Sequence, residues 1–328
     1  MSKIGSSEVL DRATSPHRVL ITGAAGFVGS HVARKLVSAR AEVHAICKPS
    51  SDRWRLADCS EGISWHTADI SDGSAIEEIF SQVRPEAVLH LGAYGIDYAQ
   101  QDPHELFNSN VYGTLFIVRM AANFGARRMI HTGSCSEFDS SRFPIPESAP
   151  LSPHTLYGIT KAASTMLVIQ QGKQLALPVI VLRLFGLYGP FEAKKRFIPT
   201  VLLACLNGRP ASLTPGQQRR DYTYIEDVAH LYASLALAQS FPQSDVFNIG
   251  SGQGHSLKEL GSLVERATGR TGMLKWGDLA HRTNEVQCQV ADISKAKREL
   301  RWLPRTSLEE GLRKTIAYFE SEQKRSDI

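Results

Sequence analysis

Three glycines between a short apolar run and a helical pattern constrain this 328-residue chain more than any other feature. Residues 18–36 read RVLITGAAGFVGSHVARKL, which predicts a buried strand at 19–21 and a helix after the glycines. Gly23 permits the tight turn out of the strand, Gly26 lets the backbone approach a pyrophosphate, and Gly29 lets helix and strand pack closely. A glycine turn before any helix can have this pattern, but the strand-to-helix context favours dinucleotide binding, with phosphates at the helix N-terminus.

Composition places the chain among ordinary globular proteins. Hydrophobic residues make up 42% and charged residues 21%, the net charge is +4, and the Lys and Arg residues are scattered. We therefore expect no nucleic-acid partner. No apolar run approaches the length of a membrane span, so no membrane association is expected. Residues 1–15 are polar and lack the apolar core of a signal peptide, and we interpret them as a flexible tail.

The cysteines indicate the compartment. They are odd in number and show no metal-ligand spacing, which predicts no metal site and a reducing, cytoplasmic location. The five are Cys47, Cys59, Cys135, Cys205 and Cys288.

Strand and helix patterns alternate through the first half of the chain. Further strands are predicted at 41–47, 64–68, 87–91, 128–131 and 179–184, with helices at 73–83, 104–124 and 157–175. This order predicts an α/β fold, a Rossmann-type doubly wound parallel sheet. After residue 184 the pattern loosens, which predicts a smaller C-terminal substrate-binding lobe. We expect a dinucleotide-binding domain with the catalytic residues at 16–184, and a mainly substrate-binding lobe at 185–328 with some elements returning to the sheet.

The end of the second predicted strand bears on the cofactor. NAD enzymes place an acidic residue there to hold the ribose 2′-hydroxyl, but this chain continues from Cys47 with Lys48, Ser51 and Arg53. Cations and hydroxyls suit a 2′-phosphate, which favours NADP(H) and leaves NAD(H) possible. The alternative is a solvated loop in which Asp52 turns inward. Asp69 and Ile70, after the third strand, are candidates for contact with the adenine edge, or else a helix N-cap region.

Tyr157 and Lys161 lie one helical turn apart and so share a face of a predicted helix. A tyrosine that exchanges a proton near neutral pH needs a stabilised phenolate, and a nearby cation provides this. Most such pairs are surface pairs, but Ser134 ends the preceding strand, where its hydroxyl can hold a substrate carbonyl. These three residues are our candidate catalytic group.

Several further motifs follow in a fixed order along the chain. They are Gly23-x-x-Gly26-x-x-Gly29, Asp69-Ile70, His90-Leu91-Gly92-Ala93, Asn110-x-x-Gly113-Thr114, Ser134, Tyr157-x-x-x-Lys161, Arg183 to Pro190, and Arg220-Asp221-Tyr222. Together, over residues 19–319, they resemble an extended short-chain dehydrogenase/reductase of the nucleotide-sugar epimerase/dehydratase family. The resemblance implies that Ser134 and Tyr157 are catalytic hydroxyls, that Lys161 lowers the tyrosine pKa and binds ribose, and that the substrate is a nucleotide-diphosphate sugar. It also implies a homodimer with a four-helix bundle of helices 104–124 and 157–175.

The predicted cofactor-binding residues combine the motifs with the end of the second strand. They are Gly23, Gly26, Phe27, Val28, Gly29, Lys48, Ser51, Arg53, Asp69, Ile70, Leu91, Gly92, Ala93, Tyr157 and Lys161. The predicted substrate-binding residues are Tyr94, Ser136, Arg196, Arg220 and Arg282. Arginine's planar fork suits diphosphate oxygens, although a solvated surface explains the arginines equally and Tyr94 can instead belong to the core.

Departures from the family pattern narrow the reaction. The 4,6-dehydratases carry an Asp-Glu pair after the catalytic hydroxyl, where this chain has Cys135 and Ser136, with Glu137 one residue too far along. Adjacent side chains of an extended segment point to opposite faces, so we interpret Cys135 as a packing residue. Gly186 replaces the family's usual diphosphate-contacting Asn.

The sequence therefore predicts an NADPH-dependent 4-ketoreductase of a nucleotide-linked 4-keto-6-deoxy sugar. A nucleotide-sugar 4-epimerase with tightly bound NAD is the main alternative. A 4,6-dehydratase and a non-catalytic NADP-binding sensor are further alternatives.

Overall fold

A computed structural model describes residues 17–97, 99–138, 143–281 and 286–326. The chain divides into two compact units. The first is drawn from Met1–Phe138, Leu151–Arg183 and Ala229–Phe247, and the second from Asp139–Pro150, Leu184–Val228 and Asn248–Ile328. The predicted tail at 1–15 and Arg282 lie outside the described residues.

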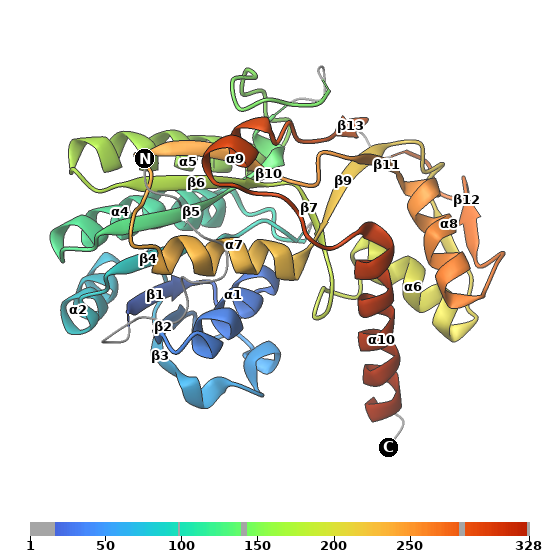
Figure 1. Cartoon of the computed structure of the whole chain (residues 1–328), viewed down its shortest axis with the longest axis horizontal. Helices are drawn as coiled ribbons and strands as arrows, with labels where there is room; N and C mark the ends of the chain where they lie inside the picture. Colours follow the sequence, from blue (N-terminus) through green and yellow to red (C-terminus); the bar gives the residue numbers. More distant parts are fainter. Residues whose placement is uncertain (1–16, 98, 139–142, 282–285, 327–328) are drawn as a thin grey trace. The chain divides into compact units, whose positions relative to one another are not determined.

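A seven-stranded sheet organises the first unit, with the order β10-β6-β5-β4-β1-β2-β3 (Figure 1). The strands are β1 (Arg18–Thr22), β2 (Glu42–Cys47), β3 (Ile63–Thr67), β4 (Ala87–His90), β5 (Arg128–Ser134), β6 (Val179–Leu184) and β10 (Asp245–Ile249). β1 pairs in parallel with both β2 and β4, so the strand order reverses between β1 and β4. In a doubly wound sheet, ligands bind at this switch point, beyond the carboxyl ends of the strands. The predicted Rossmann-type fold is confirmed.

Helices cover both faces of this sheet (Figure 1). α1 (Phe27–Ser38) and α7 (Ile225–Leu237) lie on one face, and α2 (Gly73–Val83), α4 (Gly113–Asn123) and α5 (Leu156–Gln174) on the other. Leu20, Val88 and Met129 point from the strands into a buried cluster with Phe80 of α2 and Val168 of α5. Burial on both faces explains why the strands read as continuous apolar runs.

The helix predicted at 104–124 is interrupted. It consists of α3 (Pro103–Phe107), a π-helical turn at Asn108–Tyr112, and α4. Asp102 caps α3 by accepting hydrogen bonds from the backbone N–H groups of His104 and Glu105. The wider π turn is typical of functional sites, and it turns Asn110 inward.

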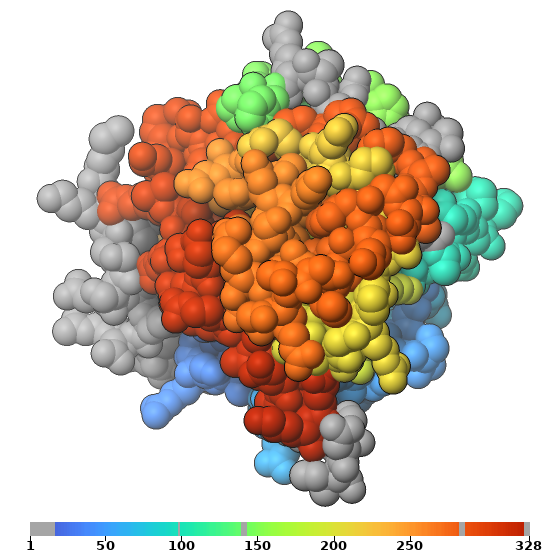
Figure 2. All heavy atoms as spheres, turned by 90° about the vertical axis from the view of Figure 1, so that its right-hand side faces the viewer, coloured from blue at the N-terminus to red at the C-terminus, as the bar shows by residue number. Residues whose placement is uncertain are grey.

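The second unit has its own small sheets and core. Its strands are β7 (Gly186–Tyr188), β8 (Ala211–Leu213), β9 (Arg219–Tyr224), β11 (Gly254–Ser256), β12 (Leu274–Trp276) and β13 (Cys288–Gln289). Its helices are α6 (Phe197–Asn207), α8 (Leu257–Thr268), α9 (Ser294–Glu299) and α10 (Leu308–Ser326). Leu202 of α6, Leu260 of α8 and Ile316 of α10 share one buried cluster. Figure 2 shows this unit from the side of α8, in orange, with α10 beside it in red.

Candidate active site

The glycine turn lies at the switch point of the sheet. Gly23 has a φ of 72°, a left-handed conformation that favours glycine. A Cβ added there would lie 2.7 Å from the backbone nitrogen of Gly92, so only glycine lets the turn after β1 touch the segment after β4. Thr22 reinforces this contact, because its Oγ1 accepts a 3.0 Å hydrogen bond from the Gly92 N–H. Two segments that were predicted separately to bind the cofactor therefore lie together.

The first turn of α1 is open to an anion. Gly26 is the N-cap residue, and within the described part of the chain no side chain caps this helix end. The N–H groups of Phe27 and Val28 therefore point out of the helix end, where the helix dipole favours negative charge. A Cβ on Gly29 would collide with the Gly23 carbonyl, so glycine is required for the turn to pack on the helix. This cradle of backbone fits a dinucleotide pyrophosphate.

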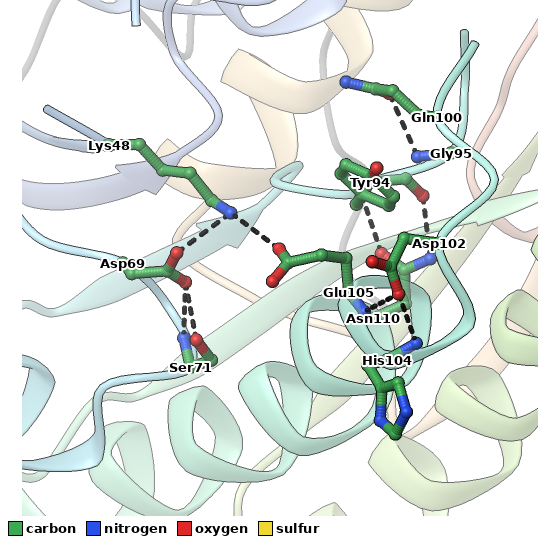
Figure 3. A network of polar contacts seen from close by, with 10 residues as sticks. All are labelled: Lys48, Asp69, Ser71, Tyr94, Gly95, Gln100, Asp102, His104, Glu105 and Asn110. Carbon is green, nitrogen blue, oxygen red and sulfur yellow. Dashed lines mark hydrogen bonds and ion pairs between the residues drawn. The ribbon is translucent and has the colours of Figure 1, made fainter. Parts of the chain in front are cut away.

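The lysine after β2 joins a polar network (Figure 3). Lys48 Nζ lies 2.9 Å from Asp69 Oδ2 and 3.7 Å from Glu105 Oε2 of α3. Asp69 Oδ1 accepts hydrogen bonds from the N–H and hydroxyl of Ser71. Burial acts to raise the pKa of Asp69, but these Ser71 bonds and Lys48 outweigh it and lower the pKa below its usual value. The Lys48 ammonium therefore interacts with two carboxylates. One of them, Glu105, is 57 positions away in the sequence, and no sequence pattern predicted this contact.

Arg55, which the sequence analysis missed, contacts the glycine turn directly. Its Nη1 donates a 3.3 Å hydrogen bond to the carbonyl of Ala25, and its guanidinium stacks on Trp54. Arg53 is two residues earlier in the chain. Its guanidinium lies 4.4 Å from the centre of the Trp65 ring and donates a hydrogen bond to Thr67 Oγ1. Arg55 belongs to a short helical turn rather than to a known motif, so spacing alone could not have identified it.

Other predicted cofactor-binding residues form backbone hydrogen bonds that fix the segments after β2 and β4. The Leu91 N–H donates to the Thr22 carbonyl, and the Ser51 N–H donates to the Lys48 carbonyl. Ile70 is buried, and its side chain joins the apolar cluster of the first unit. The Asp52 carboxylate accepts a 2.9 Å hydrogen bond from the Trp54 N–H in its own loop.

Asn110 clamps the segment after β4 (Figure 3). Its Oδ1 accepts from the Tyr94 N–H at 2.8 Å, and its Nδ2 donates to the Tyr94 carbonyl at 2.9 Å. The same Nδ2 is within 2.9 Å of Thr160 Oγ1 on α5. A Cβ on the next residue, Gly95, would lie 3.2 Å from Cδ2 of Tyr157. The clamp therefore ties the Tyr94 backbone to α5 and brings this segment against Tyr157.

The short helical turn Cys135–Glu137 with its N-cap residue Ser134, here called the serine turn, is in direct contact with the start of α5. Gly158 lies between Tyr157 and the rest of the first helical turn, and a Cβ on it would collide with the Ser136 carbonyl. Thr155 caps α5 by accepting from the Gly158 N–H. The turn that follows Ser134 therefore packs against the first turn of the helix that carries Tyr157 and Lys161.

The buried side chain of Glu137 stabilises the serine turn through hydrogen bonds and an ion pair. It is fully buried, and its Oε1 accepts from the Ser134 N–H at 2.8 Å and from Thr165 Oγ1 at 3.0 Å. Its Oε2 forms a buried ion pair with Arg183 Nε at 2.7 Å. Ser134 in turn accepts from the Ser136 N–H, which completes a capping box. The Ser-x-x-Glu spacing was the sequence signal for this arrangement.

Lys161 is almost completely buried, with 3% of its surface exposed. Burial lowers its pKa to about 8, although Glu137 opposes this effect. Lys161 therefore remains mostly cationic at neutral pH, and its charge acts on the neighbouring part of the site. A cation one turn from Tyr157 favours the phenolate.

Two buried histidines, one on β4 and one on β5, contact side chains of α4 and α5. His90 Nδ1 is 2.7 Å from Thr22 Oγ1, and His90 Nε2 is 3.0 Å from Thr114 Oγ1. Thr114 donates its own hydroxyl hydrogen to the Asn110 carbonyl, so His90 is the donor at Nε2. His131 stacks on His90 at 5.2 Å, and its Nε2 lies 3.3 Å from Ser164 Oγ. Burial and the Lys161 charge lower the pKa of His131 well below its usual value.

The buried His90 makes stability depend on pH. Burial, helped by Lys161, lowers the pKa of His90 to about 3, below its value of 6.5 in the unfolded chain. Between these values the unfolded state binds the extra proton, so stability is present above pH 6.5 and is lost as pH falls. We expect His90 alone to remove about 1.4 kcal/mol per pH unit below pH 6. Urea unfolding between pH 7 and 4.5 measures this slope.

The control is a histidine outside this network. The exposed His104→Asn should leave the slope unchanged, whereas His90→Asn should reduce it by about one proton. Equal slopes in the wild type and His90→Asn would contradict a neutral, buried His90.

The predicted substrate residues of the second unit differ in their surroundings. Arg196 precedes α6, and half of its side chain is exposed. Arg220, on β9, donates from Nη1 to the Arg219 carbonyl. At Gly186 an added Cβ would lie 2.5 Å from the Asp221 carbonyl, where β7 pairs with β9, so this close pairing requires glycine. Asp221 itself accepts hydrogen bonds from the backbone N–H groups of residues 251, 252 and 291.

The described part of the chain has no helix that is long and apolar enough to cross a membrane. No group of three or more potential metal ligands is found among the same residues. All five cysteines are free thiols.

A dinucleotide cradle beside a Ser-Tyr-Lys group defines a short-chain dehydrogenase/reductase type of site. The family model described as "NAD dependent epimerase/dehydratase family" matches residues 19–250. The chain therefore belongs to the NAD-dependent epimerase/dehydratase family, and it is an enzyme of the extended short-chain dehydrogenase/reductase class.

Curated relatives and solved structures agree with this assignment. The chain is 28% identical to a UDP-glucuronate 4-epimerase of Thermodesulfobacterium geofontis, over 90% of this chain and 94% of the relative. It is also 28% identical to a dTDP-glucose 4,6-dehydratase of Salmonella typhimurium, over 92% of each chain. Among solved structures, the UDP-glucose 4-epimerase of Thermotoga maritima with UDP-glucose has a TM-score of 0.86 at 29% identity, covering 93% of this chain and 99% of that one. WbmG of Bordetella bronchiseptica in complex with NAD has a TM-score of 0.84 at 26% identity, covering 95% and 96%.

Proposed function

We propose that this enzyme is an NADPH-dependent 4-ketoreductase of a nucleotide-linked 4-keto-6-deoxy sugar. The observation that supports the proposal is the contact between the Ser136 carbonyl, two residues after Ser134, and Gly158 at the start of α5, the helix that carries Tyr157 and the buried Lys161. Bound NADPH supplies a hydride to the keto carbon. Tyr157 donates the proton to the resulting alkoxide, Ser134 polarises the carbonyl, and Lys161 stabilises the phenolate that remains.

The surroundings of Glu137 argue against dehydration. Removal of water from the sugar needs a carboxylate that faces the substrate, and Glu137 is the acidic side chain nearest in sequence to Ser134. Its two oxygens are occupied by Ser134, Thr165 and Arg183, and the side chain is fully buried. This carboxylate supports the serine turn and is unsuited to act as a base.

We propose NADP(H) as the preferred cofactor, with NAD(H) as the alternative. No acidic residue ends β2, and two arginines follow it: Arg55, which contacts the glycine turn, and Arg53, which contacts Thr67 at the end of β3. A 2′-phosphate requires such cations, whereas a ribose 2′-hydroxyl is usually held by a carboxylate. The alternative draws support from Lys48, because Asp69 and Glu105 already neutralise its charge. It also draws support from the family's use of NAD.

A 4-epimerase that retains NAD is the second candidate. Its support is the similarity to UDP-glucuronate and UDP-glucose 4-epimerases over nine-tenths of the chain. The same Ser-Tyr-Lys group serves both reactions, because an epimerase removes a hydride and returns it at the same carbon.

One spectroscopic experiment separates the two candidates. Purified protein is mixed with NADPH or NADH and a panel of enzymatically generated UDP-, dTDP-, GDP- and CDP-4-keto-6-deoxy sugars, and the absorbance of the reduced nicotinamide is followed. Loss of NADPH absorbance with one nucleotide series supports the reductase. The epimerase is supported if the protein is purified with NAD bound, consumes no reduced nicotinamide and interconverts sugar epimers.

We propose that the first unit binds the dinucleotide and that the second contributes Arg196, Arg220 and Arg282 to the nucleotide diphosphate. Guanidinium groups match phosphate oxygens in geometry and charge. Tyr94 and Ser136, in the first unit, are proposed to contact the sugar. The free thiols support a reducing, cytoplasmic location.

We also propose a homodimer formed by α4 and α5. Large apolar side chains remain exposed at this part of the surface, including Phe107 before the π turn and Leu156, Ile159 and Met166 on α5. Ile159 and Met166 are two turns apart, so they share a face of α5. A second copy of the chain would bury this face and form a four-helix bundle.

Met166→Glu tests the dimer, because Met166 is 64% exposed and lies in the proposed contact. We expect the wild type to elute with twice the chain mass of 36.1 kDa, and the variant to elute as a single chain. Light scattering after size exclusion gives the mass. The matched control is Leu279→Glu, which alters an equally apolar residue that is 50% exposed in the second unit and should leave the dimer intact. A dimeric Met166→Glu would contradict the proposed interface.

A further inference from the structure

An acidic side chain is buried in the turn between β7 and α6. Only 5% of the Glu192 side chain is exposed, although the adjacent Lys194 and Lys195 are exposed. Glu192 Oε2 is buried and has no hydrogen-bond partner within the described residues. Its other oxygen, Oε1, lies 3.9 Å from Arg196 Nε. A buried carboxyl with one oxygen unpartnered costs folding free energy, and a residue that only filled space would avoid that cost.

The turn places Glu192 behind Arg196. The Glu192 N–H approaches the Gly189 carbonyl at 3.4 Å, and the Arg196 N–H donates to the Ala193 carbonyl at 2.9 Å. Arg196 is then the N-cap residue of α6, since its carbonyl accepts from the Thr200 N–H. One edge of the guanidinium faces the buried carboxyl, while half of the arginine side chain remains exposed for a ligand.

We infer that Glu192 is a positioning residue for Arg196, and that its proton controls the charge which the pair presents to the diphosphate of the nucleotide sugar. This inference rests on the proposed role of Arg196 as a diphosphate ligand. With a protonated Glu192 the pair carries one positive charge, and with an ionised Glu192 it carries none. A nucleoside diphosphate therefore binds more tightly while the carboxyl holds its proton.

The surroundings of Glu192 place its titration near the working pH. Burial raises its pKa to about 8, with Arg196 and a backbone hydrogen bond at Gly189 acting in the opposite direction. Among the described residues, Arg196 is the charged group with the largest effect on this pKa. An anion bound to Arg196 raises the affinity of Glu192 for its proton further, so binding near pH 8 takes up a proton.

Titration calorimetry with UDP, dTDP, GDP and CDP tests the inference without turnover. The nucleotide that binds best is measured at pH 7.5 and pH 9, where the phosphates are already ionised because their second pKa is about 6. We expect its Kd to rise about fivefold in the wild type between these pH values. Glu192→Gln cannot ionise, so its Kd should be similar at both pH values and close to the wild-type value at pH 7.5. Repeating the titration at pH 8 in buffers of different ionisation enthalpy should show proton uptake in the wild type only.

Two further variants distinguish a specific effect of Glu192 on Arg196 from a general effect of the charges in this turn. Lys194→Gln removes an exposed cation from the same turn and should keep the wild-type change of Kd with pH. Arg196→Gln should weaken binding at pH 7.5 and abolish the change. Equal pH dependence of Kd in the wild type and Glu192→Gln would overturn the inference while leaving the proposed function intact. Failure of the wild type to bind any nucleoside diphosphate would overturn both.

Discussion

Tyr157→Phe is expected to lower kcat by about 10²- to 10⁴-fold while the Kd for the reduced nicotinamide cofactor stays within about twofold. The phenylalanine keeps the ring that lies against Gly95 but removes the hydroxyl that is proposed to donate the proton. Lys161 and the glycine turn, which are proposed to hold the cofactor, are left unchanged. The reaction then loses its general acid without losing its binding site. Stopped-flow turnover measures the first quantity, and cofactor fluorescence titration measures the second.

The control for this variant is Tyr112→Phe, which removes an equivalent hydroxyl from a residue that is 54% exposed on the π turn. Its turnover should match the wild type. Unchanged turnover in Tyr157→Phe would exclude the proposed acid. Turnover lost together with cofactor affinity would instead indicate a structural collapse of the start of α5.

Arg183→Met is expected to lower the free energy of unfolding by about 3–5 kcal/mol, because it leaves the fully buried Glu137 without its cation. Both partners are nearly inaccessible, at 5% and 0% side-chain exposure, so water cannot compensate for the missing charge. Glu137 also accepts the Ser134 N–H, so loosening it should lower kcat as well. Urea unfolding and initial-rate kinetics give the two effects.

A double variant shows whether the loss comes from the unpaired charge. Replacing both partners, as Glu137→Leu with Arg183→Met, removes the buried charges together and should recover part of the stability lost in Arg183→Met. Arg298→Met breaks the exposed pair with Glu299, and it should leave the unfolding midpoint unchanged. If Arg183→Met were as mild as Arg298→Met, the buried pair would not support the serine turn.

The two ends of the proposed cofactor site differ in how far the ligand-free chain already has the binding conformation. The backbone cradle after β1 already has it, because backbone sterics at Gly23 and Gly29 determine its shape. The ribose end is different, since Lys48 is held by Asp69 and Glu105 and must exchange these contacts to meet a 2′-phosphate. Cofactor preference therefore depends on competition between carboxylates and phosphate for one cation.

The sequence by itself determined the parts of this protein that local spacing encodes. The glycine turn, the alternation of strands and helices, and Tyr157 with Lys161 follow from short-range periodicity and backbone sterics, and each was predicted in place. Strand β5 ends at Ser134, where the sequence analysis placed this serine, and the buried Glu137 accepts a hydrogen bond from the Ser134 N–H.

Only the tertiary structure decided which distant charges meet. The pairing of Lys48 with Glu105, of Glu137 with Arg183, and of Arg55 with the glycine turn joins residues whose sequence separation carries no periodic signal. The π turn at Asn110 was likewise missed, and the segment was predicted as one continuous helix. Periodicity records which face of an element is buried, whereas side-chain charge pairing depends on where the folded chain brings those faces together.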